Sequence, residues 1–232
     1  MVQNKPQAEK DPEVAIASAI GRVEAFIMRN SRSLLTALGV VIIVVGGFFG
    51  YKYLVAVPRM EKASAMMFAA EQQFAQDSFK LALNGDGNFA GFLQVIEKYG
   101  STGTGNVARH YAGICYLRLG QYQEALDYLT QYKGSTDDVP SALLAAQNYG
   151  LRGDVYVQMG DYAEAAKSYE KAVATSSVPL TAPYYLKKAG EVYEKLGDNA
   201  KALAAYEAVE VDYPTSMEAR DIQKYIGRIQ QQ

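Results

Sequence analysis

Tryptophan is missing from the chain, and cysteine and histidine occur once each, as Cys115 and His110. A single cysteine excludes an internal disulfide, and a single histidine leaves little basis for metal or thiol chemistry. Neither sign of charge dominates, because 23 basic side chains oppose 25 acidic ones and leave a formal net charge of −2. The cationic surface that a nucleic-acid duplex attracts is therefore not expected. A hydrophobic share of 49% excludes a disordered chain.

Motifs that carry catalysis or metal binding are missing as well. Cys115 lies five residues after His110, so on a helix the two side chains point in different directions and form no nucleophilic pair. No glycine-rich phosphate loop follows a strand pattern, and no pair of cysteines has metal-ligand spacing. The segment NGDGN at residues 84–88 resembles a calcium loop only faintly and is expected to be a turn. We therefore expect a non-enzyme without cofactor, metal or small-molecule substrate.

One long apolar run stands near the N-terminus. Residues 34–51 read LLTALGVVIIVVGGFFGY without a charge, and after Lys52 the apolar character continues to Val57. At about 1.5 Å per residue the uncharged part covers roughly 27 Å, and the whole run exceeds the hydrocarbon thickness of a bilayer. A cleaved signal peptide would need a short basic leader and a small-residue cleavage site, whereas 33 residues precede this run and Pro58 and Arg59 follow it. The pattern predicts an uncleaved transmembrane helix over residues 34–57.

The flanking charges favour one orientation of this helix. Five basic residues precede the span and three lie in the first 33 residues after it; they are Lys5, Lys10, Arg22, Arg29 and Arg32, and then Arg59, Lys62 and Lys80. The excess places the N-terminus in the cytoplasm. The C-terminal domain is then expected across the membrane, which is the periplasm for a single-pass protein of a bacterial inner membrane.

The segment before the span has helical periodicity. Asp11 is expected to cap a helix that begins at Pro12, and apolar residues recur on one of its faces: Ile16, Ile20, Val23 and Ile27. Such a helix either rests on the cytoplasmic membrane surface or docks a cytoplasmic partner, and we expect the first.

Within the span, Gly39, Gly46 and Gly50 fall near one face, which either packs against another transmembrane helix or is ordinary lipid-facing surface.

Beyond the membrane the chain repeats itself three times. The segments that begin at Ala112, Arg152 and Ala189 align at four positions without gaps. The aligned sets are Gly113, Gly153 and Gly190; Tyr116, Tyr156 and Tyr193; Gly120, Gly160 and Gly197; and Ala125, Ala165 and Ala202. Spacings of 40 and 37 residues are typical of antiparallel helix pairs stacked into a solenoid.

Each aligned residue has a packing reason. The first glycine and the alanine let two helices approach closely, and the tyrosine is expected to fill the remaining space. The second glycine ends the first helix with a positive φ. This pattern resembles the tetratricopeptide repeat, although the third copy has Asn199 where the first two have Tyr122 and Tyr162. We expect an all-α fold in which one transmembrane helix precedes a solenoid of tetratricopeptide-type hairpins.

The two ends of the solenoid are less regular. A degenerate unit sets Gly87 against Gly120, and a helix from Pro58 to about Leu83 is expected to form a stalk. Pro214 ends a helix, a capping box joins Thr215 to Glu218, and the inner face of a last helix carries Ile222, Ile226 and Ile229. The chain thereby divides into a cytoplasmic tail (1–33), the span (34–57), the stalk and degenerate repeat (58–100), three repeats (101–214) and a capping helix (215–232).

The first helices of successive repeats are expected to line a groove for protein partners. Projecting the register onto that face selects Val107, His110, Tyr111, Ile114 and Arg118, then Gln147, Leu151, Asp154 and Gln158, then Tyr184, Lys187, Lys188, Glu191 and Lys195. Paired lysines and asparagines that clamp an acidic C-terminal peptide are absent, because their places hold residues such as Ile114, Gly150 and Asp154.

The whole layout is similar to the single-span, tetratricopeptide-like ancillary subunit of the bacterial Sec translocon. That resemblance implies a non-catalytic protein beside the channel, whose partners are translocon subunits, a periplasmic chaperone or translocating envelope proteins. Two alternatives stay open: a structural scaffold for another envelope assembly, and an organelle-membrane receptor for imported precursors. Nucleic acid is not an expected partner.

Overall fold

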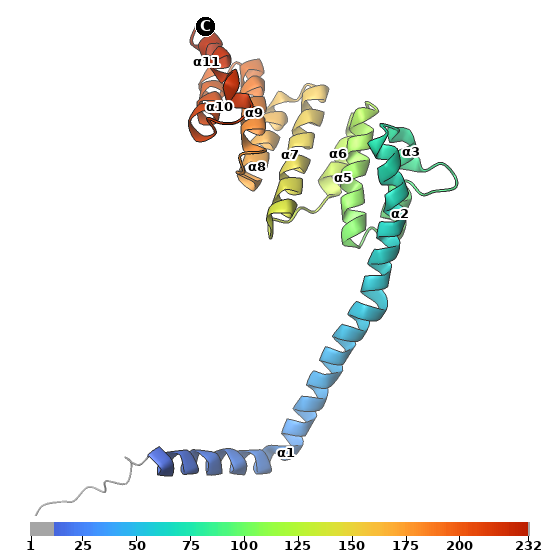
Figure 1. Cartoon of the computed structure of the whole chain (residues 1–232), viewed down its shortest axis with the longest axis vertical. Helices are drawn as coiled ribbons and strands as arrows, with labels where there is room; N and C mark the ends of the chain where they lie inside the picture. Colours follow the sequence, from blue (N-terminus) through green and yellow to red (C-terminus); the bar gives the residue numbers. More distant parts are fainter. Residues whose placement is uncertain (1–11, 232) are drawn as a thin grey trace, which may run out of the picture. The chain divides into compact units, whose positions relative to one another are not determined.

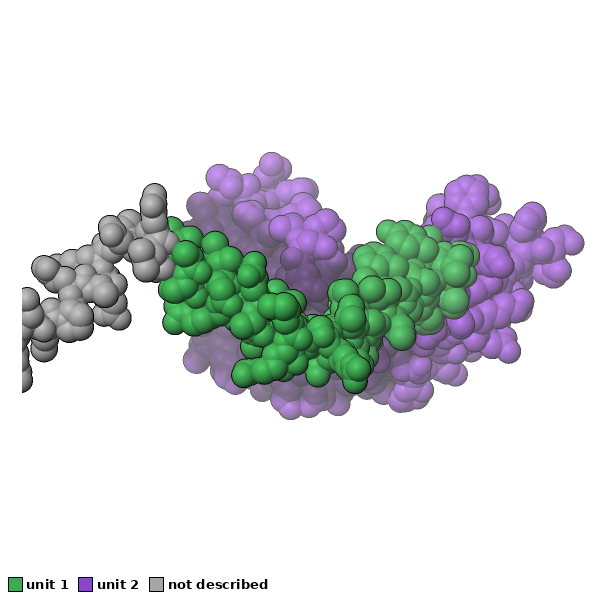
Figure 2. All heavy atoms as spheres, turned by 90° about the horizontal axis from the view of Figure 1, so that it is seen from below, with its two compact units in different colours: residues 1–58 green, residues 59–232 purple. Residues whose placement is uncertain are grey.

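The computed structural model describes residues 12–231, and every regular element in that range is a helix. The chain forms two compact units, residues 1–58 and 59–232, which are coloured separately in Figure 2. No β-strand occurs among residues 12–231, so the all-α prediction is confirmed.

The described part of the first unit is one long helical stretch with a bend. Helix α1 (Pro12–Tyr51) has non-helical backbone angles at Asn30 (φ −111°, ψ 15°) and is followed by a π-helical turn, η1 (Lys52–Ala56). Between residues 16 and 55 no side chain is buried. The helical stretch Ile16–Ala75 is long and apolar enough, by length and composition, to cross a membrane. Asp11, the expected cap, lies outside the described residues.

Figure 1 shows the second unit as a row of helices. They are α2 (Val57–Ala75), α3 (Phe79–Asn84), α4 (Phe92–Tyr99), α5 (Gly103–Arg118), α6 (Tyr122–Gln131), α7 (Val139–Met159), α8 (Tyr162–Thr175), α9 (Ala182–Leu196), α10 (Asn199–Asp212) and α11 (Ile222–Gln230). The three sequence repeats fold into the hairpins α5–α6, α7–α8 and α9–α10, whose members pack side by side. This is the predicted solenoid.

The first glycine of each repeat marks a close helix crossing. A Cβ atom on Gly153 would lie 2.5 Å from the ring of Tyr169, and one on Gly113 would lie 2.5 Å from Leu129. Gly190 has the same relation to Tyr206. The filling side chain is therefore the one sixteen residues after each glycine, and the prediction that the aligned tyrosines fill this space was wrong.

Those aligned tyrosines lie in the last turn of the first helix of each hairpin. The carbonyl oxygens of Tyr116, Tyr156 and Tyr193 accept the N–H of the residue after the second glycine at 2.9–3.0 Å. The second glycines have φ of 75°, 78° and 74°, as predicted, and the aligned alanines are fully buried. Asp161 and Asp198 then cap the next helix, each accepting a backbone N–H three residues later.

The expected stalk helix ends earlier than predicted. Helix α2 stops at Ala75, not near Leu83, because Asp77 adopts φ 56° and the N–H of Ser78 turns back to the carbonyl of Gln73. This turn brings Phe79 against Phe74, with ring centroids 5.6 Å apart. Aromatic packing gained by folding back is the physical reason for the break.

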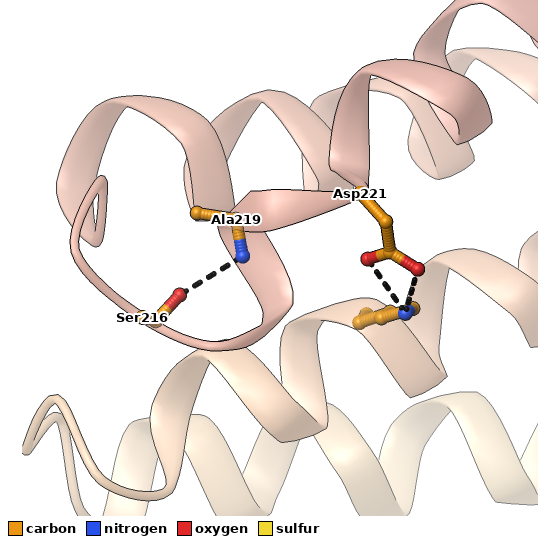
Figure 3. A network of polar contacts seen from close by, with 4 residues as sticks. Ser216, Ala219 and Asp221 are labelled. Carbon is orange, nitrogen blue, oxygen red and sulfur yellow. Dashed lines mark hydrogen bonds and ion pairs between the residues drawn. The ribbon is translucent and has the colours of Figure 1, made fainter.

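The C-terminal end also differs in detail. The predicted box between Thr215 and Glu218 does not form; Ser216 instead accepts the N–H of Ala219 at 3.1 Å and opens a short 3₁₀ turn, η2 (Glu218–Arg220). Figure 3 shows this hydrogen bond beside Asp221, whose carboxylate accepts from the Lys187 ammonium at 3.1 Å. The inner face of α11 is as predicted, because its isoleucines at 222, 226 and 229 are buried.

Candidate functional site

The solenoid has a groove of about 730 Å³ across its three hairpins. Helices α5, α7 and α9 supply most of its lining, and α6 and α8 contribute tyrosines. The lining residues are Ile114, Leu117, Arg118, Tyr122, Leu151, Asp154, Val157, Gln158, Tyr162, Tyr169, Tyr184, Lys188, Glu191, Val192 and Lys195.

The groove contains many of the residues that the repeat register selected. From the predicted set it holds Ile114, Arg118, Leu151, Asp154, Gln158, Tyr184, Lys188, Glu191 and Lys195. Val107, His110, Tyr111, Gln147 and Lys187 are not in its lining. His110 is 1% exposed, so its assignment to an accessible face was wrong, and Lys187 is held by Asp221.

Sequence reasoning missed the aromatic wall. Tyr122 and Tyr162 begin the second helices of their hairpins. The prediction considered only the first helices and therefore did not include them. Their signal was the aromatic that follows the second glycine in the first two repeats. The Tyr122 hydroxyl donates to Gln158 Oε1 at 3.3 Å, which joins the first hairpin to the second across the groove.

A charged pair lies at the centre of the groove. Asp154 Oδ1 accepts from the Lys188 ammonium and from the Tyr169 hydroxyl, both at 2.6 Å. The Lys188 nitrogen also lies 4.8 Å from the ring centre of Tyr184. Burial, then the adjacent Asp154 charge, raises the pKa of Tyr169, so its hydroxyl stays a donor at neutral pH.

The edges of the groove carry two cations that form no ion pair within the described residues. Arg118 and Lys195 are exposed, and no ion pair of either occurs within residues 12–231. The pKa of Glu191 is raised, because partial burial outweighs the nearby Lys187 and Lys188 charges. The groove therefore offers apolar and aromatic surface bordered by two exposed cations that form no ion pair in the described part of the chain.

The only histidine has a structural place between two hairpins. His110 on α5 is buried, and its Nδ1 lies 3.2 Å from the Asn148 amide nitrogen on α7. Burial lowers the pKa of His110 to about 4, so the imidazole is neutral and accepts this hydrogen bond. Burial raises the pKa of Cys115 to about 12, so this thiol is not a nucleophile at neutral pH.

We expect His110 to make the stability of the solenoid pH-dependent. Its pKa is about 4 in the folded chain and 6.5 in the unfolded chain, so its contribution is complete above pH 6.5 and is lost as pH falls towards 4. Between pH 6.5 and pH 4.5 the free energy of unfolding should fall by about 2 kcal/mol because of His110. Urea unfolding at both pH values should show that the free energy of unfolding falls less for His110→Gln than for the parent protein. An equal drop in both proteins would contradict a buried neutral imidazole.

The NGDGN segment is a turn, as expected. Asp86 Oδ1 accepts the backbone N–H of Asn88 at 2.9 Å and that of Phe89 at 2.7 Å. Both hydrogen bonds are made within the loop, so the Asp86 carboxylate stabilises the turn. Among residues 12–231 no group of three or more His, Cys, Asp or Glu side chains is arranged to hold a metal ion.

Comparison with protein families decides the nature of the repeats. Residues 106–177 and residues 151–217 each match a sequence model of the tetratricopeptide repeat. Over residues 106–217 the hairpins match the tetratricopeptide repeat family. Proteins of this repeat family are generally non-catalytic scaffolds that bind protein partners. No curated protein matches the chain in sequence.

Solved structures agree with this fold. The crystal structure of the MamA protein is 17% identical, covers 74% of this chain and 91% of its own, and has a TM-score of 0.52. A tetratricopeptide repeat protein from Parabacteroides merdae is 15% identical, with a TM-score of 0.58 over 74% of this chain and 61% of its own. At these identities the likeness shows the fold alone.

Proposed function

We propose that this protein is a membrane-anchored, non-catalytic scaffold whose repeat groove binds segments of other proteins. Tyrosines and aliphatic side chains line the groove, and the exposed cations Arg118 and Lys195 stand at its edges without an ion pair within residues 12–231. Tyrosine gives large contact area with a polar tip, which suits binding of varied polypeptides.

An extended segment fits this surface better than a compact ligand. The lining draws on three successive hairpins, so contacts are spread along the solenoid and not gathered around one deep cavity. Apolar residues of a bound segment would lie against Ile114, Leu117 and Leu151. Its acidic groups would pair with Arg118 and Lys195.

The proposed location is a bacterial inner membrane, with the N-terminus in the cytoplasm and the repeats in the periplasm. The uncharged helix over residues 34–51 and the basic bias before it support this placement. The layout further supports a role beside the Sec translocon, where emerging envelope proteins pass to periplasmic chaperones. No atom outside the local helix lies within 4 Å of an added Cβ on Gly46 or Gly50, so this face is open to a neighbouring span.

Charge reversal at the groove edge tests the proposal. We expect Arg118→Glu with Lys195→Glu to lower the yield of co-purified envelope proteins, in mild detergent followed by mass spectrometry, by roughly tenfold, since two favourable ion pairs become repulsive. Lys171→Glu with Lys224→Glu makes the same charge change at exposed positions outside the groove lining and should keep the parental yield. Equal loss in both double variants would contradict groove binding.

The identity of the proteins recovered tests the location separately. Translocon subunits and periplasmic chaperones in the parental sample support the Sec assignment. Components of outer-membrane assembly or of division would instead assign the same scaffold to another envelope complex.

A further inference from the structure

The helix before the span is set apart by a break in the backbone. Asn30 has φ −111° and ψ 15°, whereas the rest of α1 on either side is helical. Its side-chain Nδ2 donates to the carbonyl oxygen of Phe26 at 2.9 Å, four residues earlier. A side-chain donor to the i−4 carbonyl satisfies an acceptor at the end of a helix, so residues 16–29 form a segment that ends at Asn30.

This segment has a continuous apolar face. Residues Ile16, Ile20, Val23 and Ile27 are spaced by four, three and four positions and therefore share one side of the helix. Their side chains are 50–59% exposed, so nothing in the described chain covers them. Arg22 and Arg29 lie seven residues apart, well away from that stripe.

The charges and the neighbouring segment identify what covers the face. Residues 16–33 carry three arginines, Arg22, Arg29 and Arg32, against one acidic residue, Glu24. The uncharged run that would cross the bilayer begins at Leu34, so the corner at Asn30 falls at the depth of the lipid headgroups. A helix with one aliphatic face and arginines on the opposite, polar side fits an anionic lipid surface.

We propose that residues 16–29 form a helix that lies in the bilayer surface, with Asn30 as the corner between it and the transmembrane helix. The isoleucines enter the acyl boundary, and the arginines contact lipid phosphates. The inference rests on the proposed membrane anchor, because the corner positions this helix only if the span crosses the bilayer.

The absence of tryptophan allows a direct test in the full-length protein. Three single-tryptophan variants, Val44→Trp, Ile20→Trp and Ala25→Trp, each give one fluorophore. They are reconstituted into vesicles of phosphatidylcholine and phosphatidylglycerol whose acyl chains carry bromine, which quenches tryptophan on contact. Val44 reports the span, Ile20 the apolar face and Ala25 the opposite side of the same helix, about 10 Å away.

We expect strong quenching at position 44 and at least roughly twofold stronger quenching at position 20 than at position 25, because an interfacial helix buries one face only. Quenching at 44 with equal values at 20 and 25 would overturn the interfacial helix and leave the anchor standing. A blue-shifted but unquenched tryptophan at 20 would show that protein, not lipid, covers the face and would also overturn it. No quenching at position 44 would contradict both the transmembrane anchor and the proposed corner at Asn30.

Discussion

Replacing Gly153 with leucine is expected to destabilise the repeat domain by at least about 3 kcal/mol. A Cβ atom at this position already lies 2.5 Å from the Tyr169 ring, and leucine adds three further carbons. The ring has no free direction, because its hydroxyl is bound to Asp154 and its face stacks on Tyr185, with centroids 6.4 Å apart. Hairpin α7–α8 must therefore open. Urea unfolding of residues 59–232, followed by circular dichroism, measures the change.

Gly227→Leu is the matched control. Gly227 is also a helical glycine, but no atom outside its local helix lies within 4 Å of its Cβ position. Leucine has a higher helix propensity than glycine, so this variant should be neutral or slightly more stable. A similar loss at both glycines would mean that the close crossing at Gly153 is not what limits stability.

Removal of residues 1–58 is expected to move the protein completely from the membrane fraction to the soluble fraction while preserving its fold. The cut falls between the two compact units, and the repeat cores lie entirely after it. Cell fractionation and circular dichroism of the fragment measure the two effects. The spectrum should be that of a helical protein with one cooperative melting transition.

A carbonate wash of membranes provides the control for this prediction. The full chain should stay in the pellet, because a spanning apolar helix is not released by changes in charge. A fragment that remained with the membrane would show that the repeats themselves hold the protein there. Appreciable sheet content or non-cooperative melting would contradict an independent repeat domain.

The sequence was sufficient for the features that depend on one residue and its helix. Gly120, Gly160 and Gly197 all have the positive φ that their alignment predicts, since a helix end that needs this conformation selects glycine. The isoleucines of α11 are buried for a similarly local reason, their spacing along one face.

Features that depend on contacts between helices were predicted less well. The position of Tyr169 opposite Gly153 follows from how two helices cross, which periodicity within one helix does not specify. His110 was placed on an accessible face, but α7 covers it and supplies Asn148. The groove likewise includes Tyr122 and Tyr162 because second helices reach its wall. The end of α2 at Ala75 depends on the gain when Phe79 folds back onto Phe74.

Site-specific photo-crosslinking in cells shows directly whether the groove binds segments of other proteins. A photoreactive amino acid replaces Gln158, an exposed residue of the groove, or Lys171, an exposed residue outside the groove lining. We expect crosslinked envelope polypeptides from position 158 and few or none from position 171. Equal adducts at both positions, or adducts from position 171 alone, would contradict a groove that binds protein segments.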